Sequence, residues 1–196
     1  MVGFFDAMNR KKSNHQRKLL IVPILHTKED MGSLGSRLPK EDGYISVASK
    51  FWQEVEERVK RYINGFQRVK VYQDGLPNTE KELVDRIINE VTSPNYELLR
   101  FLKEKGAKVF GTEDQELLKK EYQFITQILR EQDEIKKNKL KQAYENQASE
   151  LLTKRDTYIV SRIDKTLSSG ELGILFIGAA HAIEEKLPAD IQVETL

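Results

Sequence analysis

The chain contains no cysteine, which excludes disulfide bonds, thiolate metal ligands and a cysteine nucleophile. Long apolar runs are also missing: none approaches the ~20 residues that a membrane-spanning helix needs, so we expect no transmembrane segment. Neither sign of charge dominates, because 32 basic residues stand against 31 acidic ones among 196. Without a net field there is nothing to draw the whole protein onto nucleic acid. These absences predict a cytoplasmic protein with no nucleic-acid partner.

The signatures of several common enzyme classes are missing as well. The chain has no G-x-x-x-x-G-K-[ST] phosphate loop and no G-x-G-x-x-G dinucleotide fingerprint. It has no G-x-S-x-G nucleophile elbow either. The "GSLGS" at 32–36 could wrap a phosphate but lacks the full pattern. We therefore expect neither a nucleotide-binding enzyme nor a serine hydrolase of the α/β-hydrolase kind.

Short apolar runs alternate with helical patterns along the chain. Nearly continuous apolar runs are typical of strands that are buried on both faces of a parallel sheet. They occur in "KLLIVPILH" at 18–26, "RVKVY" at 68–72, "AKVF" at 107–110 and "GILFIG" at 173–178, and "IQVETL" at 191–196 adds a short last strand. Strands that alternate with helices predict an α/β fold. We expect a mostly parallel central sheet of about four to five strands, flanked by helices.

A long helical segment precedes the last core strand. Residues 113–167 contain no glycine or proline, and one unbroken helix of that length would extend about 80 Å. A helical hairpin over 113–168, folded near Lys136 to Lys139, is more economical. The alternative is a coiled-coil arm through which the protein forms a homo-oligomer.

The sequence predicts one α/β domain at 19–196, preceded by a basic leader at 1–18. In the leader, Phe4, Phe5 and Met8 stand ahead of the basic residues, the reverse of the order in a secretory signal. The leader is either an arm that binds a membrane surface or a partner, or a segment that packs its phenylalanines on the domain.

A polar residue that could take part in catalysis or metal binding follows each predicted core strand. They are His26 after the first strand, Asp74 after the second, Glu113 after the third and His181 after the fourth. Because the carboxyl ends of parallel strands meet at one edge of a sheet, we expect these side chains to converge there. The alternative is an ordinary structural role for each one, as a strand end, a turn residue or a first-turn acid.

This set of residues fits two kinds of chemistry. His26, His181 and Asp74 could bind a divalent manganese, cobalt or zinc ion with positions left open, and the metal would activate a water molecule. Without a metal, a histidine would act as general base, oriented by a carboxylate. Small residues at Gly178 and Ala179, at an expected turn from the fourth strand into a helix that begins near His181, would let a ligand approach the backbone, where amides could bind an anion.

The same motifs resemble the TraB/Tiki superfamily, with its erythromycin-esterase-like and ChaN-like relatives. The late G-x-x-H motif of that group is present as Gly178–His181, and the early one reads Pro23–His26, with proline in place of glycine. Asp74 stands where the group has an acidic residue, and Arg155-Asp156 matches its Arg-Asp pair. The resemblance spans most of the chain.

The resemblance implies a hydrolase-like protein, metal-assisted or not, acting on a small molecule or a peptide. It implies that Arg155 fixes a carboxylate or oxyanion with its guanidinium, and that Asp156 orients Arg155 or a histidine. Two alternatives remain: a non-catalytic module that binds a small ligand or haem in the same cleft, and an interaction protein that uses the helical hairpin.

Overall fold

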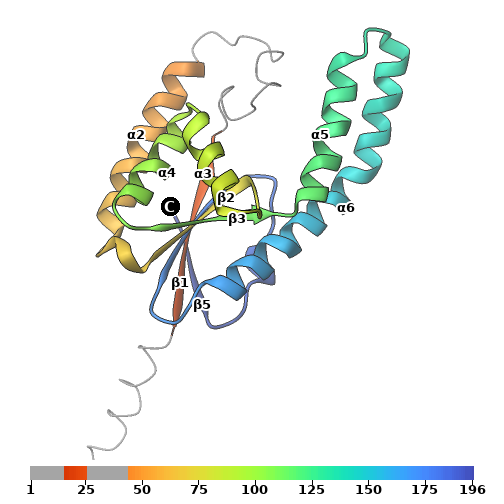
Figure 1. Ribbon diagram of the computed structural model, residues 1–196. Coiled ribbons are helices and arrows are strands. Elements are labelled where there is room, and N and C mark those ends of the chain that lie inside the picture. Colours follow the sequence, from red (N-terminus) through yellow and green to blue (C-terminus); the bar gives the residue numbers. More distant parts are fainter. Residues whose placement is uncertain (1–15, 26–43) are drawn as a thin grey trace, which may run out of the picture.

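The computed structural model describes residues 16–25 and 44–196, and its centre is a five-stranded sheet in which every pairing is parallel (Figure 1). The strands lie in the order β3-β2-β4-β1-β5. Their bounds are Arg17–Ile24 (β1), Val69–Pro77 (β2), Lys108–Glu113 (β3), Leu172–Gly178 (β4) and Ile191–Thr195 (β5). The predicted fold class is therefore confirmed. The leader residues Phe4, Phe5 and Met8 lie outside the described residues.

Helices cover both faces of the sheet, as an all-parallel sheet requires. On one face, alternate residues of β1 pack with the three helices α2 (Tyr44–Tyr62), α3 (Lys81–Glu90) and α4 (Pro94–Glu104). On the other face, the intervening residues of β1 pack against Ile159 and Ile163 of α6 (Glu134–Thr166). Among the described residues, no helix combines the length and apolar character of a bilayer span.

The path of the chain brings the ends of three strands together. From β1 it runs outward through β2 to β3, and α5 (Gln115–Arg130) and α6 then return it to the centre at β4. The central β4 pairs with both β1 and β2, and β2 pairs with β3. The carboxyl ends of β2, β3 and β4 are consequently neighbours. In parallel α/β sheets, binding sites form at this edge.

The helical hairpin is present, but its break lies earlier than expected. Helix α5 ends at Arg130 and α6 begins at Glu134, so the segment predicted to be the fold, Lys136 to Lys139, is helical. Two carboxylates make the break without glycine or proline. Glu131 accepts hydrogen bonds from the next two amides, and Asp133 caps α6 through the amides of residues 135 and 136.

The hairpin projects from the body of the protein beside the carboxyl edge of the sheet (Figure 1). The rings of Phe124 on α5 and Tyr144 on α6 pack across it, with centroids 5.8 Å apart. The carboxyl half of α6 then continues onto the sheet. One long helix thus joins the arm to the core.

A close approach of backbones shapes the end of β2. The register between β2 and β3 shifts between Gln73 and Pro77, and a Cβ at Gly111 would lie 2.0 Å from the Pro77 carbonyl oxygen. Thr112 Oγ1 donates to the Gln73 carbonyl across the same two strands, at 2.6 Å. Asp74 therefore stands where β2 leaves its regular ladder, next to the end of β3.

Candidate functional site

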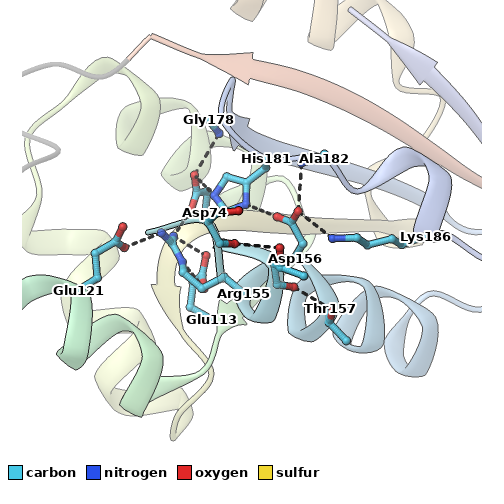
Figure 2. Close-up of polar contacts among 12 residues, drawn as sticks. Asp74, Glu113, Glu121, Arg155, Asp156, Thr157, Gly178, His181, Ala182 and Lys186 are labelled. Carbon is cyan, nitrogen blue, oxygen red and sulfur yellow. Dashed lines mark hydrogen bonds and ion pairs between the residues drawn. The ribbon is translucent and has the colours of Figure 1, made fainter. Parts of the chain in front are cut away.

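Five charged or titratable side chains gather at the carboxyl edge of the sheet (Figure 2). We call them the buried cluster: Asp74 from β2, Glu113 from β3, Arg155 and Asp156 from α6, and His181 from the turn after β4. Glu113 is completely buried, and the other side chains are almost so. Buried charges need partners, and each member of the cluster takes part in at least two hydrogen bonds or ion pairs.

Arg155 is the cation at the centre of the cluster. It grips Glu113 with two bonds, from Nε to Oε2 at 3.1 Å and from Nη2 to Oε1 at 2.8 Å. Its Nη2 also donates to Asp74 Oδ1 at 2.9 Å. Its Nη1 reaches Glu121 Oε2 on α5 at 2.5 Å. Charge-assisted, two-point bonds of this kind are strong, so Arg155 ties together the ends of two strands and the base of the hairpin.

His181 is oriented by carboxylates on both sides of its ring. Its Nδ1 lies 2.6 Å from Asp156 Oδ1, and its Nε2 lies 3.4 Å from Asp74 Oδ2. The other oxygen of Asp156 accepts from the Ala182 amide at 3.1 Å and from Lys186 Nζ at 3.0 Å. Asp156 therefore fixes the ring so that Nε2 points towards Asp74, and this is the orienting role predicted for it.

The turn after β4 differs from the expected start of a helix. The His181 amide donates to the Gly178 carbonyl at 3.2 Å and closes a tight turn; only a single 3-10 turn, Glu184–Lys186, follows. The Gly178 amide donates to Asp74 Oδ2 at 3.0 Å. Ala179 is exposed. In this structure the Gly178 amide thus positions Asp74, and the binding of a ligand or anion at Gly178 and Ala179 stays a prediction.

The environment separates the two carboxyl groups in pKa. Burial favours the neutral form of Asp74, but its hydrogen bond and charge attraction to His181, together with Arg155, hold its pKa well below the usual value. Burial raises the pKa of Glu113, and burial together with the nearby charge of Asp74 outweighs the lowering of that pKa by Arg155. The cluster thus pairs an ionised carboxylate with one that accepts a proton easily, a combination suited to acid–base work.

The same carboxylates act on His181. Burial alone would lower the pKa of its ring, but the contacts with Asp74 and then Asp156 outweigh burial and raise the pKa. The pKa of Asp156 is lowered, because its bonds to His181, Lys186 and the Ala182 amide outweigh the effect of burial. In this structure the two carboxylates therefore stabilise His181 in its charged form.

Three members of the cluster are placed to share one metal ion. Asp74, Glu113 and His181 each offer one ligand atom, and these atoms all lie within 4.8 Å of one another. Ligands of a single ion with bonds of ~2.0–2.2 Å stand at most about 4.4 Å apart, so only a small contraction is needed. The bond from Asp156 to Nδ1 is the usual support for a histidine that binds metal through Nε2.

The structure brings together four of the predicted site residues: Asp74, Glu113, Arg155 and His181. His26, the other predicted metal ligand, lies outside the described residues. Glu121 was not predicted, because one glutamate on a charged helix looks like any other. Its role depends on the hairpin, which brings it to an arginine 34 positions away.

A shallow pocket lies close to the cluster along the chain, but no member of the cluster lines it. Its volume is about 440 Å³, and its lining residues are Asp114, Leu117, Lys154, Thr157, Tyr158 and Ser161. They come from the beginning of α5 and a stretch of α6. The buried cluster and this pocket are therefore separate features of the surface and interior.

Comparisons with known proteins give no match: no family model, curated protein or solved structure is similar to the chain. The resemblance to the TraB/Tiki superfamily stays a prediction. The interpretation of the site consequently rests on its geometry and charge.

Proposed function

We propose that the protein binds a divalent metal ion through Asp74, Glu113 and His181 and uses it in a hydrolytic reaction. The single observation that carries the proposal is the convergence of one imidazole and two carboxylates, with their ligand atoms within 4.8 Å. One histidine and two carboxylates suit manganese, cobalt or zinc. A bound ion would lower the pKa of a water molecule and polarise the bond under attack.

The residues around these ligands would have distinct tasks. Asp156 holds the ring of His181 through Nδ1 and keeps Nε2 directed at the shared position. Glu113, with its raised pKa, is suited to move a proton during the reaction. Arg155 grips Asp74 and Glu113 in this structure. A metal ion would compete with Arg155 for these two carboxylates. Arg155 could then keep its ion pair with Glu121.

The charge of the carboxyl edge narrows the class of substrate. We define this edge as residues 73–80, 112–118 and 178–187, which carry seven acidic side chains and one lysine; Asp156 and Arg155 of α6 lie beside it and add one charge of each sign. Such a field attracts a metal ion but repels a polyanion. The proposal is therefore hydrolysis of an ester or peptide bond in a neutral or cationic molecule, rather than of a phosphate ester.

The test is metal-dependent turnover. Protein treated with a chelator should be inactive on ester and peptide panels and should gain activity with manganese, cobalt or zinc. Glu113→Gln should abolish that gain, whereas Glu116→Gln, the same change at an exposed residue of the same edge, should keep it. Equal activity with and without metal, or equal activity of the two variants, would contradict the proposal.

The two alternative functions, haem or small-ligand binding at the cluster and an interaction through the hairpin, have less support. Both ring nitrogens of His181 face carboxylates, an arrangement poorly suited to an axial ligand of haem.

The hairpin as a homo-oligomer interface is favoured by one observation, the 72% exposure of Ile135 near its tip. If the hairpin joins two copies, Ile135→Ser should lower the mass in solution measured by light scattering, and an unchanged mass would remove that support.

A further inference from the structure

The near-neutral net charge conceals a separation of charge between the two edges of the sheet. We define the amino edge, where strands begin, as residues 16–18, 60–70, 103–108, 164–171 and 188–190. It carries ten basic and four acidic side chains, an excess of six positive charges. The carboxyl edge has the opposite excess, with seven acidic side chains and one basic. Such segregation creates a strong local field although the whole chain is almost neutral.

Internal pairing leaves the positive charge of the amino edge uncompensated. Three of its four acids are already paired, Asp164 and Asp190 with Arg17, and Glu171 with Lys70. Two of its lysines, Lys60 and Lys103, are paired with acids just outside the edge. Six cations have no carboxylate within ion-pair distance among the described residues, and all six are exposed: Lys18, Arg61, Arg68, Lys105, Lys108 and Lys165. Only Glu104 remains to oppose them on this edge.

These cations belong to one continuous surface, because the loops that carry them touch. The ammonium groups of Lys60 and Lys105 both lie over the ring of Phe101, at 4.2 and 5.7 Å from its centroid. The guanidinium of Arg68 covers Gly170, where a Cβ would lie 2.5 Å from Nη2. The ring of Phe66, before β2, packs on that of Phe101 with centroids 6.1 Å apart, so the ends of α2 and α4 and the loops before β2 and β4 adjoin one another on this edge.

The sequence carries more basic residues just ahead of β1, in the run Arg10-Lys11-Lys12. Phe4 and Phe5 stand just before this run. Basic residues combined with bulky apolar ones supply the two signals that stable binding to an anionic bilayer needs. Binding to a nucleic-acid backbone would use the basic residues alone, without the bulky apolar ones.

We propose that the amino edge docks on an anionic lipid surface. The acidic carboxyl edge lies about 20 Å away, at the far ends of strands that rise ~3.3 Å per residue. The same surface attracts one edge and repels the other, so docking fixes the orientation of the protein. The carboxyl edge, which covers the buried cluster, then faces the water, and on the proposed function this is the side from which metal and substrate would approach.

Vesicle sedimentation tests the proposal with the full chain. We expect binding to vesicles that contain about 30% phosphatidylserine and none to vesicles of phosphatidylcholine alone, with loss of binding as salt rises above about 0.1 M. Each basic residue near such a surface contributes roughly fivefold to partitioning. Arg68→Gln/Lys105→Gln/Lys108→Gln should therefore lower the partition coefficient by about 100-fold.

The matched control removes the same charge from exposed lysines at the hairpin tip, as Lys136→Gln/Lys139→Gln/Lys141→Gln. It should bind like the wild type. A second variant, Lys18→Gln/Lys105→Gln/Lys165→Gln, should repeat the loss and show that it does not depend on the contact of Arg68 with Gly170. No binding by the wild type, equal losses in edge and tip variants, or binding of duplex DNA but not of vesicles would overturn the proposal.

Discussion

Replacing Arg155 with methionine should show whether one arginine holds the buried cluster together. The side chain is only 9% exposed and bonds to three carboxylates, those of Glu113, Asp74 and Glu121. Methionine keeps most of the length but none of the charge. Asp74 and Glu113 would then face each other without their common cation. Removing one partner of a buried ion pair typically costs about 3–5 kcal/mol.

For a protein of this size, that loss corresponds to a fall in Tm of about 6–20 °C. A divalent ion should reverse much of it, because the ion would occupy the place that the guanidinium leaves. At a concentration 100 times its Kd, an ion that binds only the folded state adds about 2.7 kcal/mol. The metal should therefore stabilise Arg155→Met more than it stabilises the wild type, in which Arg155 competes for the same oxygens.

Urea unfolding with and without chelator measures both effects. The single tryptophan, Trp52, is buried in the core and its fluorescence reports unfolding. Arg86→Met, at an exposed residue of α3, is the control and should change stability by less than about 0.5 kcal/mol. A loss below about 1 kcal/mol in Arg155→Met, or a greater gain from metal in the wild type than in the variant, would refute the reasoning.

Three further predictions concern the fold around the cluster. In chelator, the free energy of unfolding should fall at both pH extremes. The raised pKa of His181 stabilises the fold below its ordinary 6.5, and that contribution is lost as pH rises through the raised value. The lowered pKa of Asp74 stabilises the fold above its ordinary 3.8, and that contribution is lost as pH falls through the lowered value. His181→Gln should flatten the alkaline side of urea-derived profiles and reduce the fall on the acid side, because His181 helps to hold the Asp74 pKa down; an unchanged alkaline side would contradict this assignment. Glu121→Gln should weaken metal binding in calorimetric titrations, because Arg155 loses its other acceptor, whereas an unchanged Kd, or an equal change in Glu116→Gln, would exclude this coupling. Gly111→Ala should lower the free energy of unfolding measured with urea by at least about 1–3 kcal/mol. It should also weaken metal binding, because the added Cβ pushes β3 away from Pro77. Wild-type stability and metal affinity in this variant would show that the close approach of the two strands does not position Glu113.

The sequence predicted the sheet because each core strand is a short apolar run that ends at a polar residue. It also predicted where Asp74, Glu113 and His181 would meet, since the carboxyl ends of parallel strands share an edge. These inferences needed only local pattern and a general rule of topology. They held because β2, β3 and β4 are neighbours in the sheet.

The rest depends on contacts that no local pattern reveals. The break in the hairpin is made by the side chains of Glu131 and Asp133 in a stretch that is polar throughout. Glu121 reaches Arg155 only after the hairpin has closed. The turn at His181 was expected to begin a helix, yet its small residues instead aim the Gly178 amide at Asp74. In each case, long-range partners decide the role of a residue whose surroundings in the sequence are ordinary.

Direct measurement of bound metal tests the central claim, that Asp74, Glu113 and His181 share an ion. Purified protein is stripped with chelator, dialysed against manganese, cobalt or zinc, and assayed by elemental analysis beside Asp74→Asn and His181→Ala. The account predicts one tightly held ion per chain in the wild type and loss of that ion in both variants, with the fold retained by circular dichroism. No bound metal in the wild type, or the same content in the folded variants, would contradict it.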